Sequence, residues 1–279
     1  MGPRLDRTGR AERAKTSLPE RGERGNWSLW NRYSGPFGGA ILPPILGHRN
    51  SSGPEHESET MTSPSADSPT TLSQTPRTRP VRLGDRVTHA LDPIRSIIDE
   101  APICHVGFVD DAIKGQGAAS PMVIPTVPWR VGDELMIHGA SSSRMIRRLQ
   151  EGGEACITLS LIDGWVLARS AFHHSVNYRS VMLFGRPRLV AEETEKRAAL
   201  DALMEKIEPG RSAKVRAPNA QELKATSVLA FPIAEASAKR RSGPPGDDPE
   251  DMDHPVWAGV VPLRLTAGEP EQDPAQIAR

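Results

Sequence analysis

Apolar and polar residues alternate in short runs along the middle of the chain, which is the spacing of half-buried β-strands. The pair Asp163-Gly164 separates two of these runs and predicts a tight hairpin turn. Gly and Pro residues bound most of the other runs, as they do between strands. The expected strands are Ile103–Val109, Met122–Thr126, Glu134–His138, Cys156–Ile162, Trp165–Phe172, Arg179–Val190, Val228–Ile233 and Val256–Leu265.

Helical spacing, with apolar residues on one side only, appears in a few other segments. Asp92 followed by Pro93 is a favourable start for a helix that continues to about Glu100. Asn219 and Glu222 have the spacing of a capping box, which predicts a further short helix. Two more helices are expected to begin near Ser142 and Glu192 and to end before Gly152 and Pro209.

Six or more short strands, joined by hairpins and flanked by helices, predict a mainly β fold arranged as an antiparallel barrel. This domain is expected over residues 81–270. Residues 1–80 lack apolar runs and are rich in Pro, Gly, Ser, Thr and Arg, so we expect a disordered tail there, with a second flexible tail at 271–279. Met61 is a candidate for the true start of translation, because only the sequence after it resembles a short lead into the domain.

Charge and composition exclude several partners. The chain has 35 Lys and Arg residues against 35 Asp and Glu residues, so no general attraction to nucleic acid or to an anionic membrane is expected. No apolar run approaches the roughly 20 residues that cross a bilayer, and no secretory signal is evident, so we expect a cytoplasmic protein. Cys104 and Cys156 are too few for a disulfide framework and are expected as reduced, buried thiols.

A first candidate site follows the expected strand at residues 134–138. His138 lies on the more polar face of that strand, and Gly139 allows close backbone approach. Ser143 and Arg144 follow at the start of a helix, where free N–H groups and a guanidinium favour a phosphate. The same residues also fit an ordinary serine-capped helix with a surface arginine, so both interpretations stay open.

A second candidate site is the polar segment Phe172–Val181, which separates two apolar runs. Imidazole, amide, phenol and guanidinium groups there need polar partners, since burying them alone costs energy. The adjacent His173 and His174 point to opposite faces of an extended chain, so no metal site is expected from them. A ligand or a subunit boundary is the preferred partner, contacted by Asn177, Tyr178, Arg179 and Ser180.

The segments VIPT (123–126), HGASSSRM (138–145), DGWVLARSAFHHSVNYRSV (163–181) and VWAGVVPL (256–263) resemble those of the flavin-nucleotide-binding proteins related to pyridoxamine 5'-phosphate oxidase, a group that includes nitroimidazole-resistance proteins. The resemblance implies an FMN-binding split β-barrel, usually a homodimer with FMN at the subunit interface. It also implies roles for particular residues. The strand of Val123, Ile124, Pro125 and Thr126 would line the flavin, and His138, Gly139, Ser143 and Arg144 would hold its phosphate. Arg179 and Ser180 would lie on a strand that approaches the ring, and Trp257 would be contributed by the partner subunit.

Two departures argue against oxidation of vitamin B6. The oxidases proper carry a lysine just after the phosphate arginine and an arginine four residues past the tryptophan, where this chain has Met145 and Val261. The leading hypothesis is therefore an FMN-dependent oxidoreductase acting on an unidentified small-molecule substrate or electron donor. The alternatives are a non-catalytic flavin or haem carrier or sensor, with His138, His173 or His174 as the axial ligand, and an interaction domain with an empty barrel.

Overall fold

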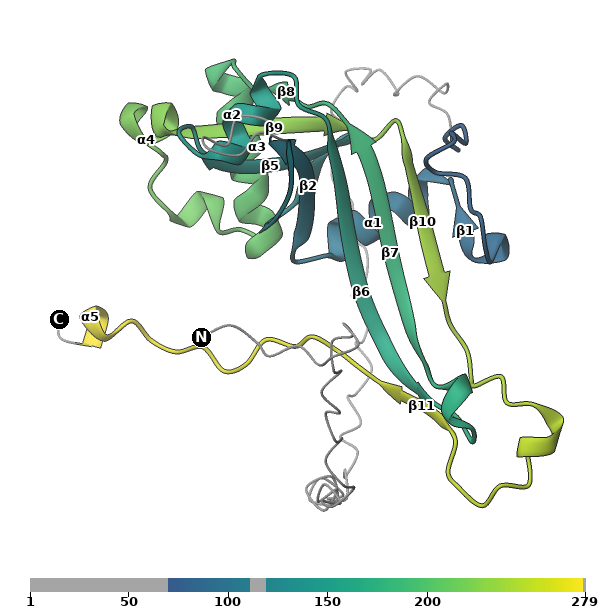
Figure 1. The fold of residues 1–279 in the computed structure, drawn as a ribbon. Helices are drawn as coiled ribbons and strands as arrows, with labels where there is room; N and C mark the ends of the chain where they lie inside the picture. The colour runs from purple at the N-terminus through teal and green to yellow at the C-terminus, as the bar shows by residue number, and fades with distance from the viewer. Residues whose placement is uncertain (1–69, 111–118, 278–279) are drawn as a thin grey trace, which may run out of the picture. The chain divides into compact units, whose positions relative to one another are not determined.

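The computed structural model describes residues 70–110 and 119–277, and the candidate start at Met61 lies outside these ranges. All strand pairs in this part of the chain are antiparallel (Figure 1). The strands are β1 (Val87–Thr88), β2 (Cys104–Asp110), β3 (Ser120–Thr126), β4 (Trp129–Val131), β5 (Glu134–Ala140), β6 (Ala155–Leu167), β7 (Ser175–Gly185), β8 (Arg188–Leu189), β9 (Thr226–Pro232), β10 (Ala236–Arg241) and β11 (Gly259–Pro262).

The strands form two sheets. The larger sheet has the order β1-β10-β7-β6-β2-β3, with β11 added beside β6, and the smaller has the order β4-β5-β9-β8. The helices are α1 (Leu91–Glu100), α2 (Arg144–Gln150), α3 (Glu193–Ile207), α4 (Ala220–Ala225) and α5 (Pro274–Ile277). Short 3-10 turns, among them η3 (Ala171–His173) and η5 (Pro249–Asp251), lie in the connections. The mainly β fold with flanking helices is confirmed, and it is a split β-barrel.

The main core lies between the two sheets. Val106 of β2, Ile137 of β5, Ile157 of β6 and Leu183 of β7 are fully buried there, together with Ile98 of α1. Burying a side chain of this kind contributes about 1.5–3 kcal/mol. Helix α1 packs against β7 and β10 of the larger sheet and β4 of the smaller one, so it joins the two sheets. From α3, the ammonium group of Lys206 donates to the carbonyls of Ile98 and Ala101, which satisfies the end of α1.

The outer face of the smaller sheet is also buried, which corrects the expectation of a polar face at residues 134, 136 and 138. Met136 is only 1% exposed and packs with Trp129, Val228 and Ala230. Leu203 of α3 belongs to the same cluster, so the helix covers this side of β5. The alternation of β5 is genuine, but both of its faces are covered, and Met136 is an apolar residue that fits either environment.

The predicted hairpin turn at Asp163-Gly164 is wrong, because β6 continues through both residues as one strand. The pairing of β6 with β7 shifts register between Ile162 and Gly164, so the Gly marks a β-bulge. The real reversal is η3, which replaces the end of the expected strand at 165–172. The strands β6 and β7 therefore extend past the barrel as a long arm, with β11 beside β6 (Figure 1).

Other expected strands differ at their ends. The strand expected at 179–190 divides at Gly185 into β7 and β8, which belong to different sheets. The strand expected at 256–265 is limited to β11. Strand β10 was not expected at all, since its sequence ASAKRR contains small and charged residues without a large apolar one. Its Ala236 and Ala238 are nevertheless buried in the core, where a small side chain is what the packing accepts.

Residues just before the expected start of the domain already make tertiary contacts. Thr71 forms a β-bridge with Ala90, and Thr78 is buried. Arg77 forms ion pairs with Glu154 and Glu235, and its guanidinium lies 4.5 Å from the centre of the Phe184 ring. The domain's contacts thus begin about ten residues before residue 81. At the other end, α5 lies within the segment 271–279. None of the helices described here is long and apolar enough to span a bilayer.

Candidate functional site

The start of α2 gathers positive charge around one buried carboxylate. Ser143 caps the helix by accepting a hydrogen bond from the Ile146 amide, and Arg144 follows with its side chain 54% exposed. The Asp110 carboxylate at the end of β2 is 3% exposed and lies 3.5 Å from Nε of Arg144 and 3.4 Å from Nε of Arg148. Asp110 therefore orients two guanidiniums from successive turns of α2.

Three arginines lie on this helix. Arg144 and Arg148 pair with the Asp110 carboxylate, Arg148 also pairs with Glu151, and Arg147 is exposed. Because Arg144 is the more exposed of the two arginines beside Asp110, it is the one placed to bind an anion.

Gly139 and His138 are neighbours in sequence, but they lie on opposite faces of β5. A Cβ on Gly139 would lie 3.1 Å from Cγ1 of Ile146, so glycine lets α2 pack closely on the end of β5. This brings Gly139, Ser143 and Arg144 together. The side chain of His138 instead points to the opposite face of β5, toward α3, and so is not brought to Arg144.

The edge strand β3 forms one wall of an apolar groove. It lies at the end of the larger sheet, so its outer backbone edge has no neighbouring strand among the described residues. Val123 is 66% exposed, while Ile124 and Thr126 are half-buried and Pro125 is exposed. The groove has a volume of about 610 Å³, and its lining includes Phe108, Met122, Val123, Arg148 and Phe184. Arg148 thus lines this groove and also shares the Asp110 carboxylate with Arg144.

His138 belongs to a second, more enclosed pocket beneath α3, with a volume of about 510 Å³. Its walls are mostly apolar and include Leu200, Leu203, Met204, Val215 and Leu223. Nδ1 of His138 is buried and has no hydrogen-bond partner among the described residues. Burial lowers the pKa of His138, which favours the neutral imidazole. The pocket thus presents an unprotonated imidazole among apolar side chains.

The four expected β7 residues are mainly engaged within the protein. Arg179 donates to Asp163 on β6 and to Glu100 at the end of α1, and these hydrogen bonds raise its pKa. Asn177 is buried, donates to the carbonyl of Gly243 and accepts from Arg241. Tyr178 and Ser180 are half-buried neighbours on the same strand. None of the four lines the groove at β3 or the pocket at His138.

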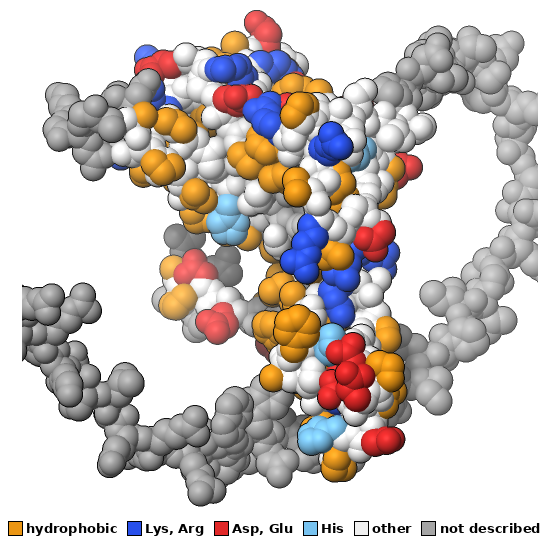
Figure 2. Space-filling view, turned by 45° about the vertical axis from the view of Figure 1, so that its right-hand side comes forward, with side chains coloured by type: hydrophobic (Ala, Val, Ile, Leu, Met, Phe, Trp, Pro, Cys, Tyr) orange, Lys and Arg blue, Asp and Glu red, His pale blue; other side chains and the backbone are white. Residues whose placement is uncertain are grey.

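Trp257 lies in the connection before β11 and is 63% exposed. Its ring packs over Gly259, where an added Cβ would come within 2.8 Å of the indole. Ile162, Trp165 and Phe172 are further exposed apolar residues of the arm, and Figure 2 shows apolar side chains gathered there. Exposed apolar area of this kind marks interaction surfaces.

Sequence reasoning missed Asp110 and Arg148 as members of the site. The expected strand ended at Val109, one residue before Asp110, and only the strand pairing places Asp110 against α2. Arg144 and Arg148 are four residues apart in the predicted helix, so the sequence could have shown that they lie on the same side of it. Asp110, the partner that they share, could not be predicted, because it comes from a strand more than 30 residues earlier.

The capping box of α4 helps to form the pocket at His138. Glu222 accepts hydrogen bonds from the amide of Asn219 and from the guanidinium of Arg216, and Asn219 accepts from the amide of Glu222. The guanidinium and amide donors lower the pKa of Glu222 from 4.5 to about 2. The following residue, Leu223, lines the pocket.

A carboxyl group whose pKa is lower in the folded than in the unfolded state stabilises the fold at pH values above the unfolded-state pKa. This contribution is lost as the pH falls toward the folded-state pKa. Replacing Glu222 with glutamine should therefore lower the melting temperature near neutral pH and reduce its fall between pH 4.5 and 2. Thermal unfolding followed by circular dichroism across this range measures both effects. Glu192→Gln is the control, because its side chain makes no described ion pair. Equal pH profiles for wild type and Glu222→Gln would contradict the assignment.

Comparison with known proteins identifies the family to which this fold belongs. The family model described as pyridoxamine 5'-phosphate oxidase matches residues 91–240, which is more than half of the chain. The chain therefore belongs to the pyridoxamine 5'-phosphate oxidase family. No curated protein matches the sequence.

Two solved structures are similar over most of the domain. The flavocytochrome Anf3 from Azotobacter vinelandii is 40% identical, with a TM-score of 0.65 over 72% of this chain and 90% of that one. The FAD and haem binding protein from Mycobacterium smegmatis is 39% identical, with a TM-score of 0.63 over 68% of this chain and 89% of that one. The predicted family resemblance is confirmed.

Proposed function

We propose that this chain is a flavin-binding redox protein that holds the phosphate of FMN or FAD beside Arg144. The observation that carries the proposal is the half-exposed guanidinium of Arg144, which shares the buried Asp110 carboxylate with Arg148 of the apolar groove on the open edge of β3. FMN is the cofactor expected from the family resemblance, and FAD is named for the Mycobacterium smegmatis relative. Both flavins share the isoalloxazine ring and a phosphate, which is the chemistry that this site recognises.

The residues present fit such a ligand. Gly139 leaves the space in which α2 and β5 approach each other, and Asp110 holds the Arg144 and Arg148 side chains in place. The free backbone edge of Val123–Thr126 offers N–H and C=O groups to the polar rim of a planar ring, with Val123 contributing apolar contact. A bound flavin supplies one-electron and two-electron transfer, and the protein supplies orientation and charge. No side chain of the site has to act as an acid or base.

The test is to extract and identify the cofactor of the purified full-length protein by chromatography. One flavin per chain is expected, and its bands should bleach under anaerobic conditions with one of the reduced nicotinamides if the protein is an oxidoreductase. A flavin that binds but accepts no electrons from these donors would favour the carrier role. Protein that is colourless and shows no change in flavin fluorescence on titration would contradict the proposal.

We also propose a homodimer formed through the arm. Ile162, Trp165 and Trp257 expose apolar area on the arm, which a single copy of the described domain leaves uncovered. A second copy covering this surface would also place Trp257 beside the groove of its partner, as the family resemblance implies. Light scattering combined with size-exclusion chromatography should give twice the mass of the chain, and a concentration-independent monomer would contradict this.

A second candidate is haem binding in the pocket at His138. It is favoured by the apolar walls and by the buried Nδ1 of His138, which has no hydrogen-bond partner among the described residues. Both solved relatives are named as flavocytochrome or haem-binding proteins. Here His138 would act as the axial ligand, while the flavin would occupy the separate groove on the other side of β5.

This candidate is tested with His138→Ala. Haem titrated into the wild-type protein should give a Soret band that the variant loses, while flavin binding stays unchanged, because His138 faces away from Arg144. His105→Ala is the matched control, since His105 is exposed on β2. A Soret band that survives unaltered in His138→Ala would exclude this residue as the ligand.

A further inference from the structure

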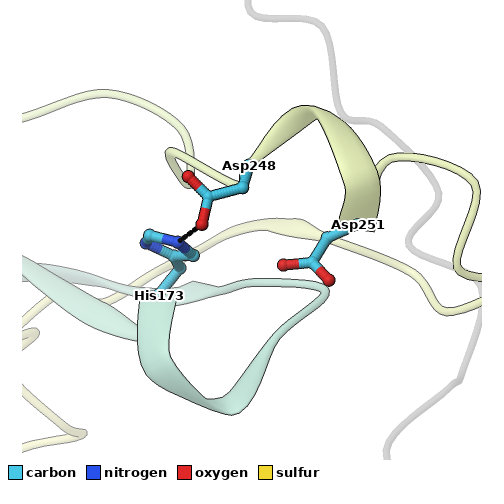
Figure 3. Close-up of side chains that lie close together, drawn as sticks. All are labelled: His173, Asp248 and Asp251. Carbon is cyan, nitrogen blue, oxygen red and sulfur yellow. Dashed lines mark hydrogen bonds and ion pairs between the residues drawn. The ribbon is translucent and has the colours of Figure 1, made fainter.

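The end of the arm contains a cluster of side chains that the flavin and haem proposals do not use. His173 belongs to η3 between β6 and β7, and Asp248 and Asp251 flank and end η5 in the connection between β10 and β11. Nε2 of His173 lies 3.0 Å from Oδ2 of Asp248. One ligand atom from each of the three residues lies within 4.8 Å of the other two. Figure 3 shows the three side chains converging, and Figure 2 shows acidic and histidine side chains together at this end.

The cluster is held in place by contacts that do not involve its three side chains. The carboxylate of Asp247 is 1% exposed and accepts hydrogen bonds from the amides of Arg169 and Ser170. It also pairs with the Arg169 guanidinium at 3.1 Å. This anchor fixes the loop to the end of β6 directly before Asp248. The backbone turn of η5 then sets the position of Asp251.

The charges in the cluster are incompletely matched. His173 satisfies one oxygen of Asp248, but the side chain of Asp251 has no hydrogen-bond or ion-pair partner among the described residues. Two carboxylates within 4.8 Å of each other repel, and a divalent cation between them would neutralise both. The imidazole adds a nitrogen ligand when a metal ion replaces the Nε2 proton that Asp248 accepts, which distinguishes the cluster from an ordinary group of exposed acids.

We propose that His173, Asp248 and Asp251 bind a divalent first-row transition-metal ion of the Zn²⁺ or Mn²⁺ class. Zn²⁺ takes one imidazole nitrogen and carboxylate oxygens at about 2.0–2.2 Å, and water completes the coordination. Two ligands of one ion are thus at most about 4 Å apart, so side-chain rotations are enough to close the cluster. Ca²⁺ and Mg²⁺ prefer oxygen ligands alone and fit this set less well.

The ion would connect the loop that follows β10 to the turn between β6 and β7. The sequence predicted no metal site, because the adjacent His173 and His174 point apart, and the structure agrees that His174 turns away, toward the carbonyl of Ser170. The partners of His173 come instead from residues 75 or more positions later. This metal site is independent of the proposed flavin site.

The experiment is calorimetric titration of tag-free full-length protein, stripped with a chelator, with ZnCl₂ and separately with MnCl₂. One saturable ion per chain is expected, with affinity reduced roughly tenfold or more in His173→Gln and in Asp251→Asn. His174→Gln and Asp253→Asn are matched controls that should bind normally. Asp251→Asn removes no described side-chain contact, so it tests the site even if His173→Gln disturbs the turn.

The proposal is overturned if the wild type shows no saturable binding of either ion. It is also overturned if both cluster variants bind like the wild type, or if the control variants lose binding equally. As a second readout, saturating Zn²⁺ should slow proteolysis of the 242–255 loop in the wild type and not in Asp251→Asn.

Discussion

Replacing Arg144 with alanine is expected to weaken flavin binding by roughly 10- to 100-fold. A hydrogen bond to a charged group contributes about 1.5–3 kcal/mol, and each 1.4 kcal/mol corresponds to a factor of about ten in affinity. The side chain is half-exposed and makes only a 3.5 Å ion pair, so its removal should leave the fold intact. The loss should appear as colourless purified protein and as a higher Kd in fluorescence titration with FMN and with FAD.

Arg147→Ala is the matched control for this variant. It removes the same charge from the same helix, but Arg147 is exposed and is not an ion-pair partner of Asp110. Equal losses in the two variants would mean that only the general charge of α2 matters. Unchanged binding in Arg144→Ala would place the phosphate elsewhere. Because unfolding of each variant is followed in parallel, a loss of binding cannot be mistaken for a loss of structure.

Local sequence signals predicted the elements whose cause is itself local. The capping box at Asn219 and Glu222 forms as expected, because its two hydrogen bonds link residues three apart. The helix at Arg144–Gln150 has its apolar and basic sides as the spacing of its residues predicted. Ser143 serves as its cap, which was one of the two interpretations left open for the first candidate site. That role does not exclude an anion at the neighbouring Arg144.

Features set by distant segments could not be predicted in this way. The burial of Met136 depends on α3, some 60 residues later, and the orientation of Arg144 depends on Asp110. Arg179, expected on a strand that approaches the flavin ring, has its guanidinium paired with Glu100 and Asp163, and no local pattern reveals these two partners. The resemblance to the family indicated the fold correctly. The side-chain partners followed only from the strand pairing.

Gly164 also shows that a local signal can be recognised and its cause misinterpreted. The glycine was expected to form a hairpin turn, but it lies within a continuous strand. A Cβ at this position would lie 2.8 Å from the carbonyl oxygen of Val261 and 3.3 Å from Cα of Pro262. Gly164 pairs with Pro262 in the register of β6 and β11. Glycine is present because another backbone approaches closely, which is the second common reason for a glycine within a strand.

Replacing Gly164 with valine should therefore detach β11 from the arm. The contact is with backbone, which cannot move aside without breaking the pairing. If two or three hydrogen bonds of about 0.5–1.5 kcal/mol each are lost, the free energy of local opening falls by about 2 kcal/mol or more. The equilibrium constant for opening then rises roughly 30-fold. Hydrogen exchange of the amides in 259–261 should accelerate by that factor, and the fluorescence of Trp257 should change.

The control for this variant is Gly185→Val, because a Cβ on Gly185 meets nothing within 4 Å and its φ is not positive. The core lies away from β11, so the melting temperature of Gly164→Val should stay close to that of the wild type. Normal exchange at 259–261 would show that β11 tolerates a side chain at residue 164. If instead β11 detaches and flavin affinity also falls, the arm carries part of the binding site, as the proposed placement of Trp257 at the partner's groove requires.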